Sequence, residues 1–104
     1  YILYTMKINI QYVKMLTSET MTDYVTKKLN KLGDKFDFII NANVFFKSEN
    51  DPRGDSQICE IELRIPGPKT FASSKERNFE LAAKNSISDL TKQLEKRKAT
   101  YKNH

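Results

Sequence analysis

The basic residues of this chain are concentrated in its last quarter, and their types and spacing are suited to binding phosphate groups. Residues 92–104 hold five lysines or arginines and one acid, Glu95, a surplus of four positive charges in a chain whose net charge is +5. The five are Lys92, Lys96, Arg97, Lys98 and Lys102. Such a row can neutralise several phosphates of a nucleic acid, and arginine adds bidentate contact or stacking on an unpaired base. The alternative is an ordinary solvated helix face, a common use of lysine near a helix C-terminus.

A second group of basic residues lies in the first third of the chain. Its members are Lys27, Lys28 and Lys31. They belong to a predicted helix that also carries Asp23 and Asp34, which are spaced to pair with some of them. Further candidates for nucleic-acid contact are Lys84 on the last predicted helix, and Lys47 and Arg53 beside a predicted loop. Charges in loops are also commonly just solvated.

The residue types needed for catalysis or metal binding are scarce. His104 is the only histidine and Cys59 the only cysteine, which leaves no intramolecular disulfide and no cysteine metal cluster. Cys59 falls on the predicted buried face of a strand, where a thiol is usually inert packing. Glu60 and Glu62 share a strand face without a base or metal ligand beside them, and the three glycines form no phosphate-binding loop. We expect no enzyme, no metal, no cofactor and no small-molecule substrate.

The composition is that of one small, basic, folded domain. The chain has 104 residues and a pI near 9.3, which favours a nucleic acid or another anionic surface as partner. It has no apolar run of about eighteen residues that would span a membrane. We expect residues 6–104, from the initiator-like Met6, to form a single domain, and residues 1–5 to be a leader or extension outside the fold. The lone cysteine and the lack of a secretory signal make the cytoplasm the expected location.

Hydrophobic periodicity predicts a strand and then a helix in the first third of the chain. Apolar and polar residues alternate over residues 7–13, which is typical of a half-buried strand. Thr17 or Ser18 can cap a helix, with Glu19 in the first turn, where the helix dipole favours an acid. The helix is expected to cover about eighteen residues. Its apolar stripe is Met21, Val25, Leu29, Leu32 and Phe36. Gly33 is expected to weaken the last turn or to end the helix.

Three strands and a long helix are predicted in the rest of the chain. Residues 39–47 are rich in β-favouring side chains, and residues 48–56 have the composition of a turn or hairpin loop. Residues 59–65 alternate between apolar and polar, and residues 70–74 read as a short fourth strand. The last helix is expected over residues 79–102. Its apolar stripe is Phe79, Ala83, Ile87, Leu90, Leu94 and Tyr101.

The order β-α-β-β-β-α predicts a two-layer α+β sandwich, in which both helices cover the apolar face of a four-stranded sheet. The first two strands are expected to be parallel, joined by a right-handed crossover, and the later strands antiparallel. Tyr12, Phe45 and Phe46 are expected mainly in the core. Because Phe45 and Phe46 point to opposite faces, the one left on the open face is a candidate for stacking on an unpaired base.

Two helical stretches, together with the element order, resemble one family of ribosome-binding proteins. The stretches are YVTKKLNKL at 24–32, followed by Phe36-Asp37, and LTKQLEKRK at 90–98, down to the closing Lys102-Asn103-His104. From Met6 to His104 the chain resembles the short ribosome hibernation-promoting factors, the ribosome-associated inhibitor and so-called sigma-54 modulation family. It differs at Asp89, where the family is often basic, and at Lys84, where the family often has an acid.

This resemblance implies a fold similar to double-stranded-RNA-binding domains, and a place in the small-subunit channel used by mRNA and by tRNA in the A and P sites. Basic family positions fall on the two predicted helices. With Lys84 and Lys102 added, the predicted RNA-binding residues are Lys28, Lys31, Lys84, Lys92, Lys96, Arg97, Lys98 and Lys102. The implied partner is the small ribosomal subunit with its rRNA, and the free protein is expected to be a monomer.

The charge pattern and the family resemblance together lead to three hypotheses about function. The first is a cytoplasmic bacterial factor that silences idle ribosomes under stress or in stationary phase by filling the decoding channel. The second is a regulatory protein-interaction module, of the sigma-factor-modulator type, that acts through Glu60, Glu62 and Arg64 on the open sheet face. The third is a general binder of structured RNA without preference for the ribosome.

Overall fold

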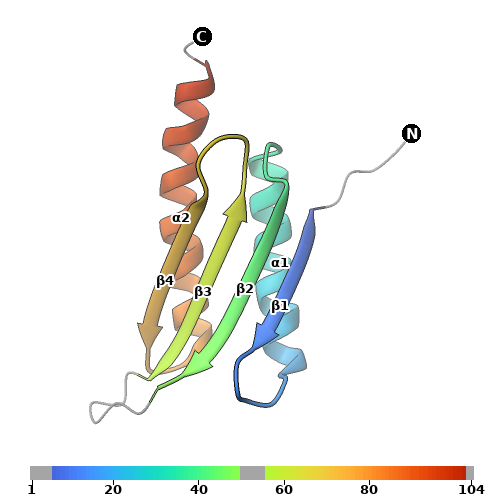
Figure 1. Ribbon diagram of the computed structural model, residues 1–104, viewed down its shortest axis with the longest axis vertical. Helices are drawn as coiled ribbons and strands as arrows, with labels where there is room; N and C mark the ends of the chain where they lie inside the picture. The colour runs from blue at the N-terminus through green and yellow to red at the C-terminus, as the bar shows by residue number, and fades with distance from the viewer. Residues whose placement is uncertain (1–5, 50–55, 103–104) are drawn as a thin grey trace.

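Two helices pack against one face of a four-stranded sheet in the computed structural model, which describes residues 6–49 and 56–102 (Figure 1). The elements are β1 (Lys7–Tyr12), α1 (Glu19–Lys35), β2 (Asn41–Ser48), β3 (Gln57–Arg64), β4 (Thr70–Glu76) and α2 (Phe79–Lys102). The sheet order is β1-β2-β3-β4, with β1 and β2 parallel and the other neighbours antiparallel. The predicted α+β sandwich is therefore confirmed. The expectations placed on residues 1–5, Arg53 and His104 lie outside the described residues.

Both helices begin at a capping side chain. Ser18 caps α1, because its Oγ accepts a hydrogen bond from the Met21 backbone N–H at 3.3 Å. Asn78 stands in the same position before α2, and its Oδ1 accepts from the backbone N–H of Leu81 at 2.8 Å. These bonds satisfy backbone donors that the first helical turn leaves without partners, so each helix start is defined locally.

Of the two outcomes expected at Gly33, an end of the helix is wrong, because α1 continues to Lys35. The helix ends where Phe36 leaves helical geometry, and the backbone N–H of Phe36 still donates to the Leu32 carbonyl at 2.8 Å. Gly33 lies beside the start of the sheet, since a Cβ added to it would stand 3.4 Å from Met6 Cε. A glycine in a helix weakens it by roughly 1 kcal/mol. Here the packing of the following turn outweighs that cost.

The strand bounds differ from the predicted ones by one or two residues at most strand ends; for example, β3 covers Gln57–Arg64 rather than residues 59–65. β2 begins at Asn41 rather than Ile39, because the Ile39 N–H donates to the Phe36 carbonyl in the turn that follows α1. β4 runs on past residue 74 to Glu76, since Lys75 and Glu76 still pair with the start of β3. Local propensity did not reveal the end of β4, because pairing with β3 decides it.

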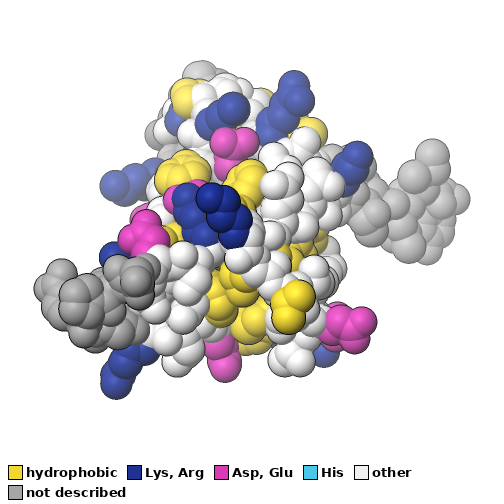
Figure 2. All heavy atoms as spheres, turned by 60° about the horizontal axis from the view of Figure 1, so that its bottom comes forward, with side chains coloured by type: hydrophobic (Ala, Val, Ile, Leu, Met, Phe, Trp, Pro, Cys, Tyr) yellow, Lys and Arg dark blue, Asp and Glu magenta, His cyan; other side chains and the backbone are white. Residues whose placement is uncertain are grey.

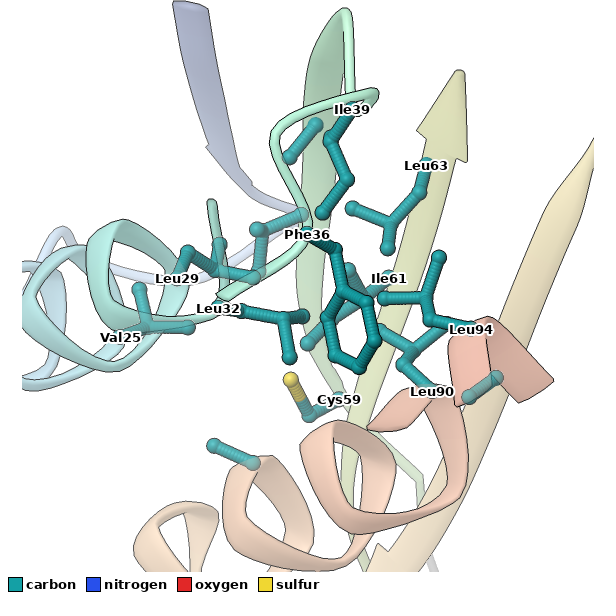
Figure 3. Packing of buried hydrophobic residues seen from close by; sticks show 14 of the residues in the cluster. Val25, Leu29, Leu32, Phe36, Ile39, Cys59, Ile61, Leu63, Leu90 and Leu94 are labelled. Carbon is teal, nitrogen blue, oxygen red and sulfur yellow. The ribbon is translucent and has the colours of Figure 1, made fainter. Parts of the chain in front are cut away.

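The core lies between the sheet and the helices and draws on every element (Figure 3). Its largest fully buried side chains are Phe36, Phe46, Leu29, Ile61, Leu63, Leu90 and Leu94. Phe46 stacks on Tyr12 with ring centroids 5.1 Å apart and meets Phe79 edge-on at 5.5 Å. Phe45 is left half-buried on the opposite, open face of the sheet. The buried face of α2 also includes Ser86, whose hydroxyl donates to the Cys59 carbonyl at 2.8 Å.

Two leucines of the chain, Leu90 and Leu16, differ sharply in burial. Leu90 is 0% exposed in the core, whereas Leu16 is 89% exposed in the loop after β1. Leu90→Ala is expected to lower the free energy of unfolding by about 2–5 kcal/mol, because it leaves a cavity. Leu16→Ala is the matched control and should stay within about 0.5 kcal/mol. Urea unfolding followed by circular dichroism measures both, and equal losses for the two variants would contradict this core.

The reactivity of the Cys59 thiol provides a second, chemical test of this core. Burial, and to a lesser extent the nearby Glu60, raise the pKa of Cys59 to about 12. In the unfolded chain a thiol has a pKa of about 8.5. Because the folded state holds the Cys59 proton more tightly than the unfolded chain, this difference stabilises the folded state in full below the unfolded pKa. The stabilisation is lost as the pH rises from there towards 12.

We expect iodoacetamide at pH 8 to alkylate the native protein at least about 100-fold more slowly than the urea-unfolded protein, because the thiolate is the reacting species. Unfolding in urea should also become easier between pH 8 and pH 10. Alkylation of the native chain at the unfolded rate would show that Cys59 is not held in this core.

Candidate nucleic-acid interface

The two helices lie side by side and run in the same direction (Figure 1). Two interactions between them show that they are also in register. Near their starts, Glu80 of α2 is close enough to Tyr24 of α1 to add to the rise in its pKa, which comes mainly from burial. Near the other end, Lys35 Nζ lies 3.8 Å from Glu95 Oε1. Basic residues on the two helices therefore form neighbouring rows along one surface of the molecule.

The row on α1 is exposed. Lys27, Lys28 and Lys31 all point to solvent, and with Tyr24 they line a shallow hollow on the outer side of the helix. Lys28 Nζ stands 5.6 Å from the centre of the Tyr24 ring, a distance at which a cation is attracted to an aromatic face. A ring with lysines around it can contact both the base and the phosphate of a nucleotide.

The predicted residues on α2 divide between its two sides. Lys98 lies towards α1, with its Nζ 5.9 Å from the centre of the Phe36 ring. Lys96 and Arg97 line a different hollow, with Gln93, whose Nε2 donates to the Phe71 carbonyl of β4 at 3.0 Å. That bond places Lys96 and Arg97 on the side of α2 next to β4. The residues predicted from the sequence therefore form two strips along α2 and do not meet at one point.

Lys84 and Lys92 extend these two strips towards the start of α2. Both are exposed. Lys84 lies one helical turn after Glu80, on the side that faces α1, and Lys92 lies one turn before Lys96. Lys102 is the last residue of α2.

Most of the predicted cations lack an acidic partner within residues 6–49 and 56–102. No ion pair forms there at Lys28, Lys31, Lys84, Lys92, Lys96, Arg97 or Lys98. Asp23 and Asp34, which the sequence offered as partners for the α1 row, form none either in this part of the chain. The positive charge of the helix surface is thus left available to an anionic partner.

On the open face of the sheet, two lysines are paired with the glutamates of β3. Lys47 Nζ lies 3.1 Å from Glu60 Oε2, and Lys69 Nζ lies 3.8 Å from Glu62 Oε1. Lys47 was a candidate RNA contact, and its charge is offset by Glu60. Phe71 is 49% exposed on this face, so it joins Phe45 as an aromatic residue that a partner could reach.

Hydrophobic side chains gather at the end of the molecule where β1 ends and the helices begin (Figure 2). Val13 and Leu16 are exposed in the loop between β1 and α1. This apolar end is separate from the basic rows, which extend along the helices away from it.

Lys35 is a basic residue of this surface that the sequence did not single out. It lies in the last turn of α1, four residues after Lys31 and seven after Lys28, so it continues the same row. Its Nζ is 5.4 Å from the centre of the Phe36 ring, close to Lys98 on the facing helix. The i, i+3, i+7 spacing was the signal that could have revealed it.

The described residues include no group of histidine, cysteine and acidic side chains arranged to hold a metal ion. Within the same residues, no helix is long and apolar enough to cross a membrane. What this surface can do chemically is to bind anions through exposed ammonium and guanidinium groups.

Known proteins with similar sequences carry a consistent description. The sequence profile of the family described as "Sigma 54 modulation protein / S30EA ribosomal protein" matches residues 8–102. A protein named ribosome hibernation promoting factor from Klebsiella oxytoca is 30% identical over 99 residues, which cover 95% of this chain and 100% of the relative. A protein of the same name from Pseudomonas putida is 30% identical over 93 residues, covering 89% of this chain and 87% of the relative.

Solved structures show the same fold at lower identity. A ribosomal subunit interface protein from Coxiella burnetii superposes with a TM-score of 0.80 at 21% identity, over 90% of this chain and 99% of the other. The N-terminal domain of Protein Y from Thermus thermophilus superposes with a TM-score of 0.72 at 20% identity, over 89% and 98% of the two chains.

Proposed function

The chain belongs to the Sigma 54 modulation protein / S30EA ribosomal protein family, and from this membership and its basic helix surface we propose that it is a ribosome hibernation factor. It binds the small ribosomal subunit in the channel that mRNA and the A- and P-site tRNAs use. Occupancy of that channel inhibits translation under stress or in stationary phase. The residues that contact rRNA are the predicted cations of the row on α1 and of the two strips on α2.

The observation that carries this proposal is the set of unpaired cations on two parallel helices. α2 has 24 residues and is therefore about 36 Å long. Cations along such a length can meet several phosphates of a folded RNA, and each contact releases counterions. Arg97 adds the possibility of a bidentate phosphate contact.

The mechanism requires no chemical step. The sheet holds α1 and α2 in fixed register, so the two rows meet rRNA as one rigid surface. Long-range attraction between this surface and the phosphates speeds the encounter, particularly at low ionic strength. Once the protein is bound, its volume excludes mRNA and tRNA, and removal of the protein restores the channel.

A protein-interaction module is the second candidate, and the exposure of Phe71 on the open sheet face favours it. Exposed aromatic side chains are enriched at protein interfaces. However, the glutamates of that face, Glu60 and Glu62, are already paired with lysines. A partner held by those acids would first have to break these pairs, whereas RNA meets unpaired cations on the helices.

Charge reversal on α2 tests the proposal. We expect the intact protein to co-sediment with small subunits and to lose affinity steeply with salt, with a slope of log K against log salt of about −4 for five phosphate contacts. The variant Lys92→Glu, Lys96→Glu, Arg97→Glu should bind more than about 100-fold more weakly, because it replaces three cations with acids.

The matched control is Lys7→Glu, Lys14→Glu, Arg64→Glu. These three side chains are exposed, and none forms an ion pair within the described part of the chain. The control changes the net charge equally but leaves the helices intact, so it should retain most of the binding. Circular dichroism checks that both variants fold. An intact protein that stays in the supernatant, or equal loss in both variants, would overturn the proposal.

Bulk tRNA added as competitor separates this function from general RNA binding. A ribosome-specific factor should stay on small subunits when tRNA is present in large excess. Displacement by tRNA at the concentrations that also saturate the protein would instead identify a general binder of structured RNA.

A further inference from the structure

One acid stands within the strongest concentration of positive charge. Glu95 lies on the α1-facing side of α2, and its carboxylate is 3.8 Å from Lys35 Nζ across the gap between the helices. The same small hollow is lined by Lys98 and by Phe36, whose ring has both lysine Nζ atoms within 6 Å, at 5.4 and 5.9 Å. Two cations therefore lie near one aromatic ring, and the Glu95 carboxylate shares their hollow.

This ion pair contributes little to holding the helices together. Its side chains are 58% and 59% exposed, and the 3.8 Å separation is at the long end for an ion pair. Exposed pairs of this kind add little to stability. Both helices also contribute buried side chains to one core, among them Leu29 and Leu32 of α1 and Leu94 of α2. The fold thus supplies no strong reason for an acid at position 95.

A carboxylate at position 95 should lower the affinity of this part of the surface for an anion. A phosphate that approaches Lys98 or Lys35 also approaches the Glu95 carboxylate and is repelled by it. In the free protein, moreover, Lys35 is engaged by Glu95 and must exchange a carboxylate for a phosphate. Both effects lower the affinity of this part of the surface for RNA.

We propose that Glu95 limits the affinity of the helix surface for RNA, and that Lys35 is a further phosphate-binding residue which Glu95 holds in the free protein. The proposal rests on the function inferred above, and it adds a control of that same site. A factor that fills the channel of an idle ribosome must leave when translation resumes. An acid within the contact surface keeps the complex reversible without weakening the fold.

The test compares Glu95→Gln with a control of the same charge change. Glu62→Gln also removes one carboxylate from an ion pair of 3.8 Å, formed with Lys69, but it does so on the open sheet face. Affinity for small subunits is measured for both variants and the intact chain at several salt concentrations, and thermal unfolding confirms that all three are folded.

We expect Glu95→Gln to bind about three- to tenfold more tightly than the intact chain, with a salt slope steeper by up to about one contact. Glu62→Gln should bind as the intact chain does. Lys35→Gln should weaken binding about twofold in the intact chain and more strongly in the Glu95→Gln background, because Lys35 is then fully available to phosphate.

Three results would overturn the inference. They are unchanged or weaker binding by Glu95→Gln, an equal gain in Glu62→Gln, and no additional loss when Lys35→Gln is combined with Glu95→Gln. Each can occur while the intact chain still binds small subunits, in which case the proposed function stands and this inference fails. If the intact chain does not bind small subunits at all, the proposed function fails and this inference fails with it.

Discussion

Parallel pairing of β1 with β2 is the constraint on which the basic surface of α1 and α2 depends. Because β1 and β2 run in the same direction, the connection through α1 must run back along the sheet. The antiparallel pairs β2–β3 and β3–β4 then return the chain to the direction of β2, so α2 also runs back. Both helices therefore point the same way on the same face. Strand topology therefore aligns the lysines of the two helices, and the buried core sets how closely the two helices approach each other.

Charge is distributed differently over the two layers of this sandwich. On the sheet face, Lys47 and Lys69 are paired with the glutamates of β3, so these charges offset one another. On the helix face, cations stand unpaired in the described part of the chain, apart from Lys35 with Glu95. In the proposed function, one layer serves as the scaffold and the other as the contact surface for an anionic partner. The function inferred from this arrangement needs no reactive group, in keeping with the placement of Cys59 in the core.

Much of this was predictable because the sequence has clear periodicity. The alternation in β1 and β3 and the three-to-four spacing in both helices led directly to the α+β sandwich. Features that depend on contacts between distant residues were missed. Ser86 reads as a polar surface residue until the Cys59 carbonyl is found beside it. The division of the α2 cations became visible only when Gln93 was seen to bond β4. The sequence showed that either Phe45 or Phe46 must be buried, and packing against Tyr12 and Phe79 determined which.

The orientation of the protein on the ribosome tests the proposed function most directly. A cryo-electron microscopy structure of the small subunit saturated with this chain would show it. We predict density in the mRNA and tRNA channel, with α1 and α2 against rRNA phosphates and the open sheet face turned away from that contact. A protein bound outside the channel, or one that meets RNA through the sheet while its helices face solvent, would contradict it.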